Sequence, residues 1–256
     1  MDLKDKTIVI TGAASGIGRA MAIRFAAEGA KWVVCADLNM DGAEETAKMV
    51  GDTALAFKCN VAQEADIIDL IETVEAGYGA IDLFCSNAGI GVGRGPETPD
   101  EDWYKIIDIN VMAHVWAARH LVPKMIARGG GYLLNTASAA GLLSQIGSMP
   151  YAVTKHAAVG LAEWLALTYG DQGIKVSVLC PQAVRTEMTK GHEDGVAAID
   201  GMMEPEPVAD ACVETIRDET FLVLPHKEVL GYMRAKTADY DRWIGGMRKL
   251  NRRYEL

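Results

Sequence analysis

Tyr151 and Lys155 lie four residues apart in a segment with helical periodicity, so their side chains should point to one face of a helix. A free phenol has a pKa of about 10 and is a poor base near neutral pH. A neighbouring ammonium group stabilises the phenolate and lowers that pKa, so this pair could take a proton from an alcohol. Ser138 ends a predicted strand and could hydrogen-bond the reacting oxygen. Taken singly, the three residues also fit structural roles as a core aromatic, a surface charge and a strand-end hydroxyl.

A glycine-rich segment, residues 11–18, follows the first predicted strand and opens the first predicted helix. Glycines allow a sharp turn and a close approach to a phosphate, and free amides at the helix start attract its charge. Asp37 ends the second predicted strand, where a carboxylate accepts hydrogen bonds from the adenosine ribose and repels a 2′-phosphate. Because Ala14, Ser15 and Leu38 supply no basic side chain to offset that repulsion, the sequence favours NAD over NADP.

Short apolar segments alternate with longer amphipathic segments along the chain. The apolar segments are rich in Val, Ile and Leu with little polar alternation, which is typical of strands buried on both faces. This alternation predicts one doubly wound, Rossmann-like α/β domain over residues 1–256, with a seven-stranded parallel sheet and helices on both faces. Strands are predicted at 7–11, 31–36, 54–59, 81–86, 132–137, 175–180 and 221–224, and helices at 16–28, 42–49, 62–76, 100–127, 151–169 and 207–217.

Two segments interrupt the alternation. Residues 187–205 are rich in Gly, Met and charge, and they are predicted to form a substrate loop beside the carboxyl end of the sheet. Residues 226–256 carry apolar side chains at helical spacing and many basic ones. This tail is predicted to be a helix that packs on its own domain or on another subunit.

Composition excludes several classes of protein. Of 256 residues, 50% are hydrophobic and 23% are charged, which excludes a disordered chain. The formal net charge of −10 argues against a nucleic-acid partner. No apolar stretch approaches the roughly 20 residues of a membrane helix, and the N-terminus does not resemble a signal peptide, so a cytoplasmic protein without a membrane partner is expected. The five Cys and five His show no metal-ligand spacing, so no metal site is assigned.

The spacing of residues 11–18, Thr-Gly-x-x-x-Gly-x-Gly, resembles the cofactor turn of the short-chain dehydrogenase/reductase family. Over roughly residues 5–190, further family-like motifs follow in the family's order. They are Asn87-Ala88-Gly89, Asn110, Ser138, the Tyr151/Lys155 pair, and Pro181 with Thr186.

The resemblance implies an NAD-dependent oxidoreductase that reversibly oxidises a secondary alcohol to a ketone. Hydride would pass to nicotinamide while Tyr151 takes the hydroxyl proton. The Asn110 position would bend its helix and hold, through its backbone carbonyl, a water bonded to Lys155. The implied catalytic residues are Asn110, Ser138, Tyr151 and Lys155. The implied cofactor-binding residues are Gly12, Ser15, Gly16, Ile17, Gly18, Asp37, Asn60, Val61, Asn87, Ala88, Gly89, Tyr151, Lys155, Pro181, Val184 and Thr186.

The chain departs from the family pattern near the expected site. Asn60 stands where the family usually has Asp, and Gln182 stands in place of the usual Gly. The expected pocket walls are largely apolar and favour an uncharged aliphatic, cyclic or aromatic alcohol, although Arg94, Arg185 and Lys190 leave an acidic substrate open. The expected walls are Ile90, Val92, Ala139, Ala140, Leu142, Gln145, Met149, Gln182, Ala183, Met188 and His192.

Two alternative functions stay open: an enzyme of the same fold that catalyses dehydration or epimerisation, and a non-catalytic NAD-binding redox sensor. The sequence also predicts a homodimer or homotetramer, because two helices carry apolar residues on more faces than one sheet can bury. These residues are Trp103, Val111, Val115, Leu121, Val153, Leu161, Trp164 and Leu165. A monomer whose tail covers this surface is the alternative.

Overall fold

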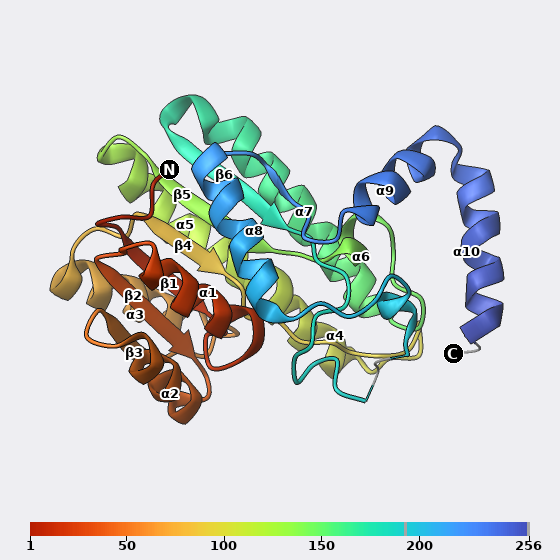
Figure 1. The fold of residues 1–256 in the computed structure, drawn as a ribbon, viewed down its shortest axis with the longest axis horizontal. Helices are drawn as coiled ribbons and strands as arrows, with labels where there is room; N and C mark the ends of the chain where they lie inside the picture. The colour runs from red at the N-terminus through yellow and green to blue at the C-terminus, as the bar shows by residue number, and fades with distance from the viewer. Residues whose placement is uncertain (192–193, 255–256) are drawn as a thin grey trace.

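The computed structural model describes residues 1–191 and 194–254. The prediction of a doubly wound fold is confirmed: seven parallel strands form one sheet in the order β3-β2-β1-β4-β5-β6-β7 (Figure 1). The strands are β1 (Thr7–Thr11), β2 (Trp32–Asp37), β3 (Ala54–Lys58), β4 (Leu83–Ser86), β5 (Gly131–Thr136), β6 (Ile174–Leu179) and β7 (Leu222–Val223).

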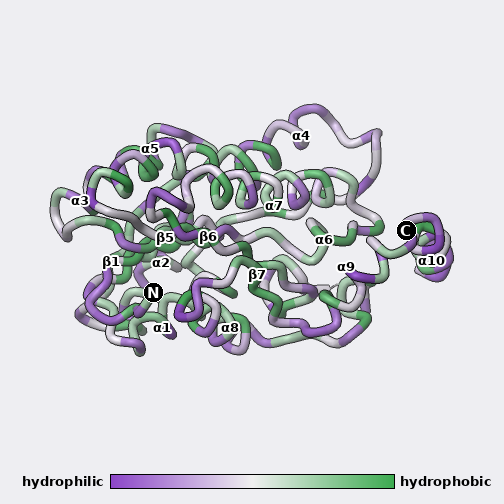
Figure 2. The backbone as a smooth tube through the Cα atoms, turned by 90° about the horizontal axis from the view of Figure 1, so that it is seen from above, coloured by the Kyte–Doolittle hydropathy of each residue, from purple (hydrophilic) through white to green (hydrophobic). Residues whose placement is uncertain are grey.

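Helices cover both faces of the sheet, which explains why every residue of the central strands β1 and β4 is buried (Figure 2). One layer contains α3 (Glu64–Tyr78), α4 (Asp100–Ile107), α5 (Ala113–Ala127) and α7 (Met149–Tyr169). The other contains α1 (Gly16–Ala27), α2 (Met40–Val50) and α8 (Pro205–Asp218). A short helix, α6 (Ala139–Leu142), lies between β5 and α7, and α9 (Glu228–Ala238) and α10 (Tyr240–Tyr254) end the chain.

The carboxyl ends of β1, β4, β5 and β6 meet at one edge because all four strands are parallel neighbours. The loops that follow them therefore bring together segments far apart in the sequence: residues 12–15, 87–99, 137–148 and 180–204. In an open α/β sheet, this edge is where ligands bind.

Two predicted helices are divided in the structure. The segment predicted as one helix over 100–127 contains a π-helical turn, Asp108–Met112, between α4 and α5. Such single turns interrupt the regular helix and are common at functional sites. The tail forms two helices, α9 and α10, and α10 stands apart from the sheet and its covering helices in both views (Figures 1 and 2). Among the described residues, no helix has the length and hydropathy needed to cross a bilayer.

Candidate active site

A cleft of about 400 Å³ opens at the carboxyl edge of the sheet. Its lining includes every residue that the sequence predicts for cofactor binding, together with Ser138. Residues from β2, α7 and the loops after β1, β3, β4, β5 and β6 therefore face one cavity. Among the described lining residues, the charged side chains are Asp37, Lys155 and Glu187.

The turn between β1 and α1 leaves no room for side chains at two glycines. A Cβ added at Gly18 would lie 2.1 Å from the Gly12 carbonyl oxygen, and one at Gly12, whose φ is +69°, would lie 2.8 Å from Ala88 Cα. Ser15 precedes the first turn of α1 and makes no side-chain hydrogen bond to it. The first amides of a helix have no partner within the helix, so this turn offers open donors to a phosphate.

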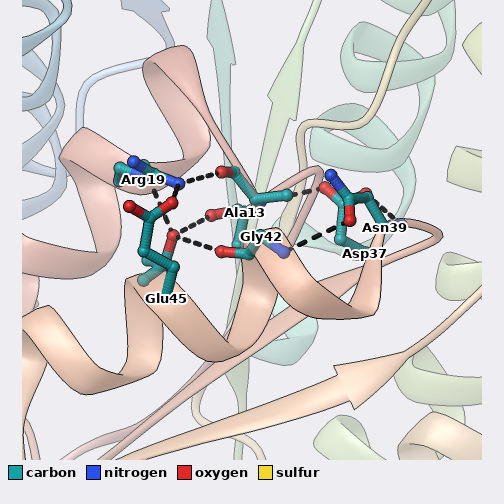
Figure 3. A network of polar contacts seen from close by, with 8 residues as sticks. Ala13, Arg19, Asp37, Asn39, Gly42 and Glu45 are labelled. Atoms are coloured by element: carbon teal, nitrogen blue, oxygen red, sulfur yellow. Dashed lines mark hydrogen bonds and ion pairs between the residues drawn. The ribbon is translucent and has the colours of Figure 1, made fainter.

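Asp37 ends β2 beside this turn, and two backbone amides orient its carboxylate (Figure 3). The Ala14 amide donates to Oδ2 and the Asn39 amide donates to Oδ1, each at 2.9 Å. The nearby guanidinium of Arg19 is held elsewhere: it donates to the Ala14 carbonyl at 2.6 Å and pairs with Glu45 at 2.6 Å (Figure 3). The negative charge of Asp37 therefore stands in the cleft without a basic partner among these residues.

Asn60 lines the cleft where the family usually has Asp. Its side-chain oxygen accepts from the Ala62 backbone amide at 3.2 Å, and its backbone amide donates to the Asp66 carboxylate at 2.9 Å. A carboxamide oxygen has two lone pairs, so one acceptor position stays available to a ligand.

Asn87 joins the ends of three strands. Its side-chain nitrogen donates to the Thr11 carbonyl at 3.0 Å, and the Thr136 hydroxyl donates to its side-chain oxygen at 3.1 Å. Both polar atoms of the side chain are thus used within the protein, and the following Ala88 and Gly89 form the adjoining cleft wall.

The structure brings the predicted catalytic side chains Ser138, Tyr151 and Lys155 together. The Ser138 hydroxyl precedes α6, accepts from the Ala140 amide at 3.1 Å and donates to the Pro181 carbonyl at 3.3 Å. It also lies close enough to the Tyr151 phenol to lower the pKa of that group. Lys155 lies one turn beyond Tyr151 on α7, with its ammonium nitrogen 5.5 Å from the centre of the Tyr151 ring. The ammonium donates to the Thr136 carbonyl at 3.1 Å, which fixes it at the end of β5.

Burial controls the ionisation of this pair. It lowers the pKa of Lys155, which is 3% exposed, to about 8. Burial also raises the pKa of Tyr151, and the hydrogen bond from Ser138 only partly opposes this. The expectation that Lys155 lowers the pKa of Tyr151 below that of a free phenol is therefore wrong for the protein without ligands, because desolvation of the phenolate has the larger effect.

Asn110 lies in the π-helical turn and is fully buried rather than part of the cleft lining. Its side-chain oxygen accepts from the Ile90 amide at 2.9 Å, and its side-chain nitrogen donates to the Ile90 carbonyl at 3.0 Å and to Thr154 Oγ1 at 3.2 Å. A Cβ added at Gly89 would lie 3.3 Å from the Asn110 oxygen and 3.4 Å from the Lys155 ammonium. Asn110 therefore braces the loop after β4 against α7, directly beside Lys155.

The substrate walls were only partly predicted. Ile90, Gln182 and Met188 line the cleft, whereas Val92, Ala139, Ala140, Leu142, Gln145, Met149 and Ala183 do not. The main reason is α6, which the sequence pattern did not predict and which buries Ala139 and Ala140. His192 lies outside the described residues.

Three polar contacts around Gln182 were not expected. Its backbone amide donates to His226 Nδ1 at 3.2 Å, and its side-chain nitrogen donates to Asp200 at 3.0 Å. The Tyr232 hydroxyl donates to the other oxygen of Asp200 at 2.9 Å. These contacts join the cleft wall, the segment 187–205 and α9. They connect positions up to 44 residues apart, for which the sequence carries no local signal.

The loop after β6 is organised by Thr189, which was also not predicted. Its hydroxyl donates to the Val184 carbonyl at 2.6 Å and accepts from the Thr186 amide at 3.0 Å. The Thr-x-x-Thr spacing of Thr186 and Thr189 is a signal that could have indicated this hydroxyl-bonded turn.

A buried polar pair lies behind Lys155. His114 Nδ1 is 3.2 Å from the side-chain oxygen of Asn135, and burial, with the charge of Lys155, lowers the pKa of His114 to about 4. His114 is therefore neutral near pH 7.

Arg94, Arg185 and Lys190 are the basic residues that could have bound an acidic substrate. None of them is part of the cleft lining. Arg185 pairs with Glu204 at 2.8 Å and Lys190 with Glu187 at 3.4 Å. The third, Arg94, lies in the loop after β4 and does not line the cleft.

Comparison with known proteins agrees with this geometry. The short chain dehydrogenase family model matches residues 6–197. The chain is 33% identical over 227 residues to epidermal retinol dehydrogenase 2 of Homo sapiens, covering 85% of this chain and 73% of that protein. It is 32% identical over 228 residues to cyclohexanol dehydrogenase of Acinetobacter sp. (strain SE19), covering 86% and 90%. A short chain dehydrogenase/reductase of Burkholderia phymatum, solved in complex with NAD, superposes with a TM-score of 0.86 at 27% identity, covering 94% and 96%.

The chain belongs to the short-chain dehydrogenase/reductase family. It is an oxidoreductase that acts on a CH–OH group.

Proposed function

We propose that this protein is an NAD-dependent dehydrogenase that reversibly oxidises an apolar, cyclic secondary alcohol to a ketone. The observation that carries the proposal is the grouping of Ser138, Tyr151 and Lys155 in the cleft that the predicted cofactor-binding residues line. The relatives named for cyclohexanol and retinol act on alcohols that are largely hydrocarbon, which supports an apolar substrate.

Three residues of the chain have separate roles in the proposed reaction. The Tyr151 oxygen takes the proton of the substrate hydroxyl, and the Ser138 hydroxyl donates a hydrogen bond to the substrate oxygen. Lys155, held by the Thr136 carbonyl, stabilises the Tyr151 phenolate and holds the ribose next to it. Bound NAD supplies the acceptor for the hydride that leaves the carbinol carbon.

The cleft residues fit a dinucleotide along its length. The open amides of α1 hold the pyrophosphate, Asp37 accepts from the adenosine ribose hydroxyls, and Asn60 accepts from the adenine amino group. Thr186 and the Val184 backbone hold the carboxamide.

Asp37→Ala is expected to lose the preference for NAD. The substitution removes hydrogen bonds to the ribose and repulsion of a 2′-phosphate together. Hydrogen bonds to a charged group contribute about 1.5–3 kcal/mol, so kcat/KM for NAD should fall about 10- to 100-fold. Asp37→Asn keeps one acceptor oxygen without the charge and separates the two effects. Steady-state kinetics with NAD and NADP check this prediction, and equal kcat/KM for both cofactors in the unmodified protein would contradict it.

The reaction itself is tested by NADH absorbance with a panel that includes cyclohexanol, open-chain secondary alcohols and hydroxy acids. We expect the cyclic alcohols to give the highest kcat/KM, because no cation other than Lys155 lines the described part of the cleft. A dehydratase or epimerase would convert substrate without net NADH. A redox sensor would bind NAD without turnover, and either result would refute the proposal.

Assembly through α7 is expected as well. Val153, Trp164 and Leu167 on this helix are 49%, 54% and 86% exposed. Leu121 and Leu165, which the sequence assigned to the same excess surface, are buried in the protomer's own core and do not contribute. Light scattering at micromolar concentration should give a dimer or tetramer, and Trp164→Glu should lower the mass. A monomeric mass for the unmodified protein would contradict this prediction.

A further inference from the structure

The last helix, α10, is amphipathic but has no buried residue. Tyr240, Trp243, Ile244, Met247 and Leu250 recur at helical spacing along one side. Tyr240 is 53% exposed and Ile244 is 45% exposed. In both views the helix stands outside the body of the protomer (Figures 1 and 2). A side of this kind is usually covered by another surface.

The start of α10 is fixed rather than loosely tethered. Lys236 on α9 is 7% exposed, and its ammonium donates to the carbonyls of Leu142 and Leu143 at 2.8 and 2.9 Å. The same ammonium lies 5.5 Å from the centre of the Tyr240 ring and 4.9 Å from that of Trp243. Lys236 therefore connects the start of α10 to the C-terminal end of α6 and fixes the direction in which α10 projects. A pre-oriented helix loses less entropy on binding a protein surface.

The composition of α10 matches a protein interface. Its basic residues are four Arg and one Lys, against one acidic residue, Asp241. Arg, Trp, Tyr and Met are enriched at protein–protein interfaces, whereas Lys is depleted. The whole chain has a formal net charge of −10, so the body of a second copy is an acidic surface that complements this helix.

One acidic segment of the body is suited to receive α10. The first turn of α4 carries Asp100, Glu101 and Asp102 in succession, followed by Tyr104, which is 66% exposed. Within the described residues, no basic side chain forms an ion pair with these three carboxylates. Both views place α4 toward the end of the molecule from which α10 projects (Figures 1 and 2). A two-fold arrangement can then pair each α10 with the α4 of the other copy.

We propose that α10 is an arm that docks on a second copy of this chain, with its apolar side buried and its arginines paired with the acidic first turn of the partner's α4. The contact is distinct from the surface of α7. It also ties assembly to the active site, because Lys236 anchors the arm to α6, the helix that follows Ser138.

The test is a charge exchange between the two surfaces, measured by sedimentation velocity of the full chain at micromolar concentration. Arg248→Glu with Arg252→Glu reverses the sign of two charges on the arm. Asp100→Lys with Glu101→Lys reverses the sign of two charges on α4. Each pair alone should lower the mass by half, and the four substitutions together should restore it. Lys31→Glu with Lys48→Glu makes the same change in net charge as the arm pair, on exposed residues near β2 and on α2, and it should leave the mass unchanged.

Ile244→Asp tests the apolar side of α10 by changing an exposed residue rather than a buried one. This substitution should also halve the mass. The proposal is overturned if the unmodified protein is a monomer, if the arm variants keep its mass, or if the exchanged variant does not recover it. Flotation with phosphatidylserine vesicles addresses the other occupant of a basic amphipathic helix. Vesicle binding that the arm variants abolish, with unchanged mass, would equally overturn the proposal.

Discussion

Tyr151→Phe is expected to lower kcat by about 10²–10⁴, the usual contribution of a positioned proton-transfer group. The substitution keeps the ring and its packing but deletes the oxygen that accepts the substrate proton. Folding and NAD affinity should therefore change little. The measurement is kcat with a verified alcohol, accompanied by a thermal melt and by fluorescence titration with NAD.

Ser138→Ala is the matched comparison for this variant. It also removes one hydroxyl from the same site, but the Ser138 hydroxyl is proposed to hold the substrate oxygen rather than to exchange a proton. Turnover should fall while NAD affinity stays nearly intact. If Tyr151→Phe is folded and turns over within a few-fold of wild type, Tyr151 is not the base. Alcohol oxidation in the wild type should rise with pH, because the phenolate is the reactive form.

Lys155→Met is expected to slow turnover and weaken NAD binding together, since one ammonium is proposed to stabilise the phenolate and hold the ribose. Met keeps most of the apolar stem in a site that is 3% exposed. The two effects are separated by measuring kcat at saturating NAD and the Kd for NAD by titration. Loss of turnover with an unchanged Kd would contradict the double role.

The same variant has a signature in stability. The pKa of Lys155 is about 8 in the folded protein, against an ordinary value of 10.5 for the unfolded chain. Between these values the unfolded chain binds more protons, so this group makes the folded state more stable as the pH rises from 8 to 10.5. The Tm of the wild type minus the Tm of Lys155→Met, both measured without cofactor, should therefore increase as the pH rises across this window. A constant difference between the two melting curves would show that Lys155 is not desolvated.

Local patterns were sufficient to predict the sheet and the cofactor turn. β1 is a continuous run of buried residues, Thr7–Thr11, and the glycines follow it directly, so strand, turn and helix start were defined by neighbouring residues. Ser138, Tyr151 and Lys155 could also be placed together, because the ends of parallel strands share one edge.

Other features depend on contacts that no local pattern carries. α6 is a single turn of four residues, Ala139–Leu142, and is too short to show helical periodicity. The contacts of Gln182 with Asp200 and His226 depend on how the last helices fold back on the sheet. The pKa of Tyr151 depends on a balance of burial against charge that spacing alone does not fix. The four-residue spacing predicted that the Lys155 ammonium lies beside Tyr151, but it did not predict how strongly burial desolvates the Tyr151 phenol.

All five cysteines are buried, and they are distributed over both layers of the core. Cys59 and Cys180 belong to the layer with α3, α5 and α7, while Cys35, Cys85 and Cys212 belong to the layer with α1 and α8. Burial raises the pKa of Cys35, Cys59 and Cys180 to about 12, so almost no thiolate is present near neutral pH. The thiols of the native protein are therefore expected to react slowly with oxidants and alkylating reagents. Cys59 borders the cleft, whereas the other four thiols become reactive only when their layer opens. The rate of labelling at those four cysteines therefore reports how often that side of the sheet separates from its helices.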